Sequence, residues 1–124
     1  MEYNFDNERP IYIQLVEIIR ISIISGKLEC GGRLPSVREL ALMMKVNPNT
    51  IQKALSELED EKLIYTERTN GKYVTNDIKL IENVKKDLAK KEVNNYLNKM
   101  KSIGIDYNAA LNCLQELGGK NGTN

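Results

Sequence analysis

Residues 34–50, Leu-Pro-Ser-Val-Arg-Glu-Leu-Ala-Leu-Met-Met-Lys-Val-Asn-Pro-Asn-Thr, decide the fold of this chain. Ser36 can cap the free amides of a helix, and Glu39 three residues later completes the pattern of a capping box. Asn47 and Pro48 form a second helix start, because a capping side chain precedes a proline whose missing amide costs nothing in a first turn. The pattern predicts a short helix over about residues 36–44, a turn over 45–47 and a second short helix over about 48–61.

A two-stranded hairpin is predicted directly after the second helix. Residues 63–67 and 72–74 are rich in strand-favouring side chains, and residues 68–71 between them end in the Asn-Gly pair typical of a tight hairpin turn. Residues 33–35 can add a short strand to this hairpin. Two helices, a turn and a hairpin in this order predict a winged helix-turn-helix, a fold in which the second helix enters the DNA groove and the hairpin is the wing.

An earlier helix is predicted over about residues 10–25, begun by Pro10 and ended by Gly26. It serves as scaffold. Apolar or small residues recur at helical spacing in all three predicted helices, so each has one face that should turn inward. These positions are Ile11, Leu15, Ile18, Ile19 and Ser22 in the first helix, Val37, Leu40, Ala41 and Met44 in the second, and Ile51, Ala54, Leu55 and Leu58 in the third.

The chain changes character at about Asp77. A long helix rich in lysine and asparagine is predicted to reach about Ser102, Gly104 breaks it, and Asp106 caps a short final helix before residues 118–124 trail off as a disordered tail. The fold class is thus mainly α with a small β-hairpin: a winged helix-turn-helix in residues 1–76, followed by a helical segment in residues 77–124.

The two C-terminal helices each carry one apolar face, which two helices cannot enclose by themselves. We therefore expect these helices to pair with the same helices of a second copy, giving a symmetric homodimer. The alternative is that they fold back on the winged domain of a single chain.

Composition excludes several classes of protein. No apolar run approaches the roughly 20 residues of a membrane span, and the acidic N-terminus lacks the form of an export signal, so a cytoplasmic protein without membrane contact is expected. Cys30 and Cys113 lie far apart and the chain has no histidine, which leaves no common zinc spacing, no disulfide framework and no usual general base. We expect no enzyme activity, no metal and no cofactor. A redox role for the Cys30 thiol stays open as an alternative.

Charge supports nucleic-acid binding by its placement and not by its total. The net charge is +1, and residues 1–76 carry 10 basic against 11 acidic side chains. The acids Glu57, Glu59, Asp60 and Glu61 gather in the C-terminal half of the second short helix, whereas its N-terminal half holds none.

Eight side chains are the candidate DNA contacts. On the second short helix, amides suit adenine, threonine suits a phosphate or a thymine methyl, and lysine suits a phosphate or guanine. A basic residue at the start of the preceding helix would face the backbone, and two on the wing would lie near the minor groove. In plainer interpretations, Asn47 only caps its helix, Gln52 and Lys53 are a solvated face, and Arg38 pairs with a glutamate. The candidates are Arg38, Asn47, Asn49, Thr50, Gln52, Lys53, Arg68 and Lys72.

Five motifs closely resemble those of the GntR family of bacterial transcription regulators, and the resemblance covers most of residues 10–74. They are Pro10–Leu15, Gly26–Leu28, Leu34–Ala41, Val46–Ala54 and Leu63–Arg68. The short two-helix tail is similar to that of the YtrA subfamily. The resemblance implies a homodimer that binds double-stranded DNA at a palindromic operator, usually as a repressor and often near genes of an ATP-driven membrane transporter. It carries DNA contact to Arg38, Asn47, Asn49, Thr50, Gln52 and Arg68.

The chain departs from the family pattern at two places. Lys62 stands where a glycine usually ends the recognition helix, and Thr69-Asn70 replaces the usual glycine-containing pair at the wing tip. The competing hypothesis is a winged-helix module that binds a partner protein and never DNA. The sequence offers no signature of a pocket for a small-molecule effector, and we expect Tyr96 and Tyr107 to be packing residues.

Overall fold

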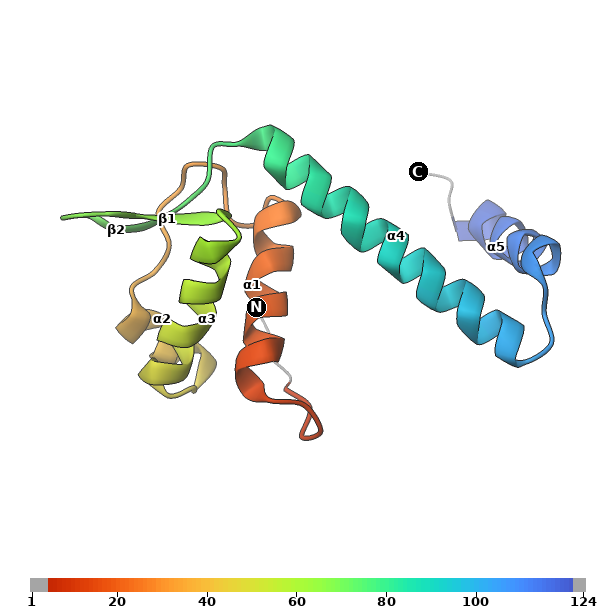
Figure 1. The fold of residues 1–124 in the computed structure, drawn as a ribbon, viewed down its shortest axis with the longest axis horizontal. Coiled ribbons are helices and arrows are strands. Elements are labelled where there is room, and N and C mark those ends of the chain that lie inside the picture. Colours follow the sequence, from red (N-terminus) through yellow and green to blue (C-terminus); the bar gives the residue numbers. More distant parts are fainter. Residues whose placement is uncertain (1–4, 122–124) are drawn as a thin grey trace. The chain divides into compact units, whose positions relative to one another are not determined.

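The structure is a computed structural model that describes residues 5–121. Contacts divide the chain into two compact units, Met1–Val84 and Lys85–Asn124. Figure 1 shows the course of the chain through five helices and one hairpin within the described part. The elements are α1 (Ile11–Ile24), α2 (Val37–Met44), α3 (Pro48–Asp60), β1 (Ile64–Glu67), β2 (Gly71–Val74), α4 (Ile78–Ser102) and α5 (Tyr107–Asn121). The mainly α winged helix-turn-helix predicted from the sequence is confirmed.

Both short helices begin at the caps that the sequence predicts. The Glu39 amide donates to Ser36 Oγ at 3.1 Å, and the Ser36 amide donates back to Glu39 Oε1 at 3.1 Å, which completes the capping box. At α3 the Asn49 amide donates to Asn47 Oδ1 at 2.8 Å, and Pro48 is the first helical residue. Because these contacts satisfy amides that have no partner within the helix, they fix where α2 and α3 start.

Helix α3 lies at the centre of the first unit and packs against α1, α2 and β1. Its four predicted inward residues, Ile51, Ala54, Leu55 and Leu58, are all 0% exposed. Arg20 of α1 clamps the end of α3, donating from Nε to Glu61 Oε1 at 2.9 Å and from its Nη2 to Glu61 Oε2 at 2.5 Å. The orientation of α3 about its own axis is therefore set from three sides.

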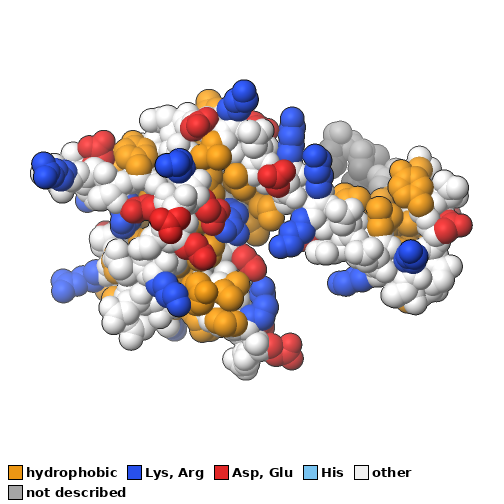
Figure 2. Space-filling model, viewed as in Figure 1, with side chains coloured by type: hydrophobic (Ala, Val, Ile, Leu, Met, Phe, Trp, Pro, Cys, Tyr) orange, Lys and Arg blue, Asp and Glu red, His pale blue; other side chains and the backbone are white. Residues whose placement is uncertain are grey.

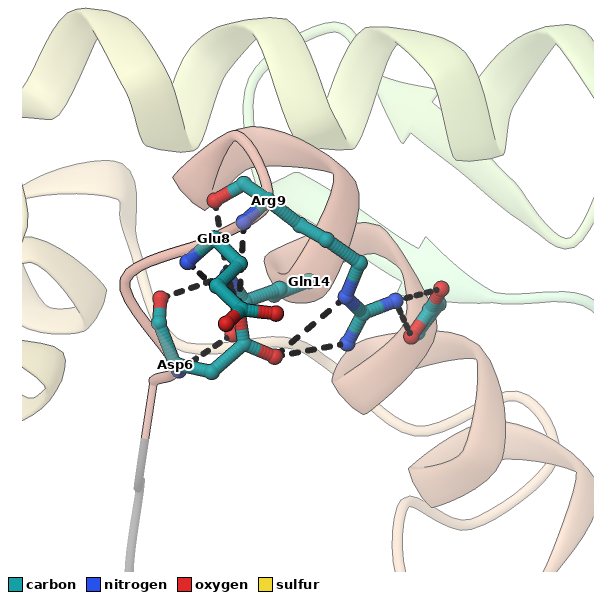
Figure 3. A network of polar contacts seen from close by, with 5 residues as sticks. Asp6, Glu8, Arg9 and Gln14 are labelled. Carbon is teal, nitrogen blue, oxygen red and sulfur yellow. Dashed lines mark hydrogen bonds and ion pairs between the residues drawn. The ribbon is translucent and has the colours of Figure 1, made fainter.

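Helix α1 differs from the predicted pattern at its N-terminal end. Ile11, expected on the inward face, is 38% exposed, whereas the polar Gln14 is only 4% exposed. Gln14 can be buried because its amide makes three hydrogen bonds to backbone groups: Nε2 donates to the carbonyls of Asp6 and Arg9, and Oε1 accepts from the Asp6 amide. Arg9 in turn donates to both carboxylate oxygens of Glu17 (Figure 3). This network holds residues 6–9 against α1.

The wing is a hairpin with a third segment at its edge. Strands β1 and β2 pair antiparallel, with Ile64 opposite Val74. In place of the short strand predicted over residues 33–35, the structure has an isolated bridge between Arg33 and Tyr73. The Leu34 amide donates to the Lys72 carbonyl at 2.8 Å, and the Val74 amide donates to the Gly32 carbonyl at 2.9 Å. The segment before α2 is thereby hydrogen-bonded to the wing.

The second unit is a helical pair formed by the later turns of α4 and by α5. Gly104, at φ +86°, allows the turn between them, and Asp106 Oδ1 accepts from the Ala109 amide at 2.9 Å, as the predicted cap requires. The Tyr96 hydroxyl donates to the Ala110 carbonyl at 2.9 Å and ties the two helices together. Partial burial and the neighbouring Cys113 thiol raise the pKa of Tyr96.

The end of α5 corrects the prediction of a disordered tail from residue 118. The helix continues through Gly118 and Gly119 to Asn121, because glycine lowers helix stability without removing a backbone hydrogen bond. Residues 122–124 lie outside the described part. None of the described helices is long and apolar enough to cross a membrane.

Lys62, which follows α3, provides the first testable prediction. It adopts φ +66°, a left-handed conformation that is strained for side chains other than glycine. We expect Lys62→Gly to stabilise the protein by about 0.5–1 kcal/mol in urea unfolding, since relief of strain exceeds the added chain entropy. Lys62→Ala removes the same charge but keeps the strain. An equal gain in the alanine variant would contradict this explanation.

Candidate nucleic-acid interface

The N-terminal half of α3 presents an exposed polar face. Asn49, Gln52 and Lys53 are exposed, and Thr50 is half-buried. Their neighbours Ile51 and Ala54 are fully buried. The helical period thus places the polar set on the side of α3 away from its buried residues. The exposed set lies beside the free amides of the helix N-terminus, which favour negative groups. This face has the donors and acceptors needed to contact base edges and phosphates.

At the start of α3, two members of the candidate set have a partner within the protein. Asn47 uses its side-chain oxygen to cap α3, which is the structural role that the sequence offered as the alternative to DNA contact. The Lys53 ammonium lies 3.9 Å from the centre of the Tyr12 ring, a cation–π contact. Tyr12, Asn49, Thr50 and Lys53 line a shallow hollow of about 350 Å³ with Ile11. Tyr12 was not among the predicted site residues, because its approach to α3 depends on how α1 packs.

Arg38 lies in the first turn of α2 and is exposed. The sequence left open whether it pairs with a glutamate. Among residues 5–121 its guanidinium has no ion-pair partner. Arg38 therefore remains available for a phosphate.

Two acids of the C-terminal half of α3 are neutralised inside the protein. Glu61 is paired with Arg20, and Glu59 is paired with Lys72 of the wing and accepts from the Thr66 hydroxyl. Burial acts to raise the pKa of Glu59, but the contacts with Lys72 and Thr66 outweigh it, so this pKa lies below the ordinary 4.5. Figure 2 shows acidic side chains gathered over this half of α3 and basic side chains at the end of the wing.

The two predicted wing contacts are placed differently. Arg68 is exposed in the turn between β1 and β2. Lys72 has a side chain only 18% exposed, and Glu59 holds it against α3. Sequence inspection did not reveal this pairing, because Glu59 and Lys72 are separated by 13 positions and by a chain reversal.

Neither cysteine takes part in this surface. Both are free: Cys30 is exposed, and Cys113 is half-buried in the second unit. Residues 5–121 contain no group of three or more histidine, cysteine, aspartate or glutamate side chains that could hold a metal ion.

A central helix with a buried apolar face and an exposed polar start, crossed by a second capped helix and flanked by a hairpin, defines the class of this protein. It is a winged helix-turn-helix protein.

Comparisons with known proteins place the chain within that class. Residues 11–74 match the family described as "Bacterial regulatory proteins, gntR family". The HTH-type transcriptional repressor YtrA of Bacillus subtilis is 37% identical over 97 residues, which span 78% of this chain and 70% of YtrA. A GntR family transcriptional regulator from Listeria monocytogenes has a solved structure with a TM-score of 0.85 and 42% identity, over 90% of this chain and 98% of that one. The DNA-binding domain of AraR, solved in complex with operator ORE1, has a TM-score of 0.52 and 28% identity over 60% of this chain and 94% of its own.

The chain belongs to the GntR family of DNA-binding transcription regulators and is similar to its YtrA-like members. The proteins of this group are regulators and not enzymes.

The pair between Glu59 and Lys72 leads to a prediction about acid stability. Because the folded-state pKa of Glu59 is lowered, its contribution is fully present above the unfolded value near 4.5 and is lost as pH falls through the lower folded-state pKa. We expect Lys72→Met to lower the free energy of unfolding at pH 7, and the difference from wild type to shrink below about pH 4.5. Urea unfolding at several pH values measures it. Lys27→Met, at an exposed lysine without an ion pair among the described residues, is the control.

Proposed function

We propose that this protein is a sequence-specific repressor that binds a palindromic operator as a homodimer. The observation that carries the proposal is the polar N-terminal end of α3. Its amide and hydroxyl side chains are uncharged and can hydrogen-bond to base edges. Its relatives support the same function, since AraR binds an operator and YtrA is a repressor. We infer that it acts in the bacterial cytoplasm, where operator DNA lies.

The proposed contacts fall into three groups. Asn49, Thr50 and Gln52 face base edges from α3, with Lys53 beside them. Arg38 faces a phosphate from the start of α2, which fixes the position of the domain without choosing a sequence. Arg68 approaches the adjoining minor groove from the wing tip.

The second unit supplies the argument for a homodimer. Leu114 is 51% exposed and Leu117 is 59% exposed on α5, and Val93 is 53% exposed on α4. Leu111, Leu114, Val93 and Tyr107 are among the residues that line an apolar hollow of about 390 Å³ between these helices. Orange side chains on the surface of this unit are visible in Figure 2. Exposure of such an apolar face to water is unfavourable. A second copy of the chain carries the same apolar face, so an isologous contact between the two copies would remove both faces from water.

Proposals about the regulated genes, and about whether transcription is lowered or raised, rest only on the relatives of this chain. The resemblance to YtrA supports repression, and we propose a transporter operon as the target. The geometry assigns no effector, because the hollow in the second unit is accounted for by the proposed partner copy.

Operator binding is tested with duplexes selected from random sequence. We expect an inverted repeat to be enriched, with affinity that falls steeply as salt rises. Gln52→Ala should relax the preference at one base pair of each half-site by about 1–3 kcal/mol, whereas Arg38→Ala should weaken binding to all duplexes similarly. Quantitative shift assays compare these variants. Selection that enriches no sequence, or that enriches a site without two-fold symmetry, would overturn the proposal.

Dimer formation is tested in the second unit. We expect wild type to be a dimer at micromolar concentration by light scattering. Leu114→Lys places a charge in the apolar face and should give monomers with much weaker binding to the full inverted repeat. Asn112→Lys adds the same charge about half a turn away on α5 and should remain dimeric. A monomeric wild type would favour the alternative in which these helices fold back on their own winged domain.

A further inference from the structure

We infer that Arg33, which precedes α2, is a DNA contact of the wing and binds a phosphate beside the minor groove. The inference rests on the proposed function and adds a residue to it. In the proposed complex, Arg33 takes the role for which Lys72 is the obvious candidate from the sequence.

The backbone joins Arg33 to the wing. Arg33 forms a bridge with Tyr73, and its neighbours on both sides are hydrogen-bonded to β2. The Leu34 amide donates to the Lys72 carbonyl at 2.8 Å, and the Gly32 carbonyl accepts from the Val74 amide at 2.9 Å. Directly paired residues of antiparallel segments direct their side chains to the same face. The side chain of Arg33 therefore starts on the face of the wing that carries the Tyr73 ring.

The side chain then extends toward the hairpin turn over Gly71. A Cβ atom built on Gly71 would lie 3.4 Å from Arg33 Nε and 3.5 Å from one of its terminal nitrogens. Gly71 has φ +102° and begins β2 immediately after the turn that contains Arg68. The glycine thus lets the backbone turn and leaves room for the guanidinium beside it, so two segments of the chain bring basic groups to the end of the wing.

Arg33 is available for a ligand. It is exposed, and its guanidinium makes no hydrogen bond or ion pair within the described part of the chain. Hydrogen bonds with Ser36 lower the pKa of the Glu39 carboxylate, and Arg33 is near enough to contribute to this lowering, but Glu39 hydrogen-bonds to Ser36 and not to Arg33. Lys72, by contrast, donates to both Glu59 Oε1 and Thr66 Oγ1. To reach DNA, Lys72 would have to leave a partly buried carboxylate unpaired, which is costly.

The charge balance of the wing also favours Arg33 as a DNA contact. With Lys72 neutralised by Glu59, the hairpin end holds Arg68 and the acidic Glu67, which lies opposite Gly71. These two charges cancel, so the wing would have no net attraction for DNA by itself. Arg33 makes the end of the wing net positive, and its planar group can donate two parallel hydrogen bonds to phosphate oxygens.

The test measures operator affinity of the full-length chain between about 50 and 300 mM KCl, a range in which counterion release dominates. We expect Arg33→Gln to reduce the slope of log affinity against log salt by about 1 and to weaken binding about tenfold near 0.1 M salt, with the same loss on all duplexes. Arg33→Lys should restore the slope. Lys27→Gln removes one exposed positive charge at the turn after α1 and should leave the slope unchanged.

The outcomes separate this inference from the proposed function. Thermal unfolding of each variant shows whether the wing remains folded, and rescue by Arg33→Lys distinguishes a charge contact from a packing role. If wild type binds its operator and Arg33→Gln behaves as Lys27→Gln does, the inference about Arg33 is overturned alone. A wild-type chain that binds no duplex overturns both.

Discussion

One face of α3 is completely buried, and this burial fixes how the other elements of the first unit are arranged around it. Ile51, Ala54, Leu55 and Leu58 are removed completely from solvent by α1, α2 and β1. The isoleucine and leucine side chains each contribute on the order of 1.5–3 kcal/mol when buried, so a rotation of α3 about its axis would be very costly. With the inner face fixed, the polar residues at the start of α3 must face outward. The core and the candidate DNA surface are two sides of the same helix.

Among the described residues of the winged unit, some charged side chains are paired with one another, and others are exposed without a partner. The acids near the end of α3 would repel DNA, yet Arg20 and Lys72 neutralise two of them and at the same time tie α3 to α1 and to the wing. Arg33, Arg38 and Arg68 keep their guanidinium groups exposed. A chain of nearly zero net charge can therefore present a basic edge, because the paired charges cancel inside and the unpaired ones remain outside.

The parts of the fold that local chemistry specifies could be predicted from the sequence. Ser36 and Asn47 set the starts of α2 and α3, because a cap contacts amides only two or three residues away. The turn at Asn70-Gly71 was likewise evident from the residues themselves. Errors arose where helical periodicity or glycine content was a poor guide. Ile11 stays exposed and Gln14 is buried by its contacts with residues 6–9, and α5 extends past its glycines because glycine keeps the backbone hydrogen bond.

Spacing and local capping were enough to specify the order of the elements, the buried and exposed faces of α3 and membership of the GntR family. Which basic side chains are free follows instead from how the folded chain packs. Lys72 meets Glu59 across a chain reversal, Tyr12 meets Lys53 between two helices, and Arg33 reaches Gly71 from the segment before α2. Such pairings join residues far apart along the chain, and the packing of α1, α3 and the wing creates them.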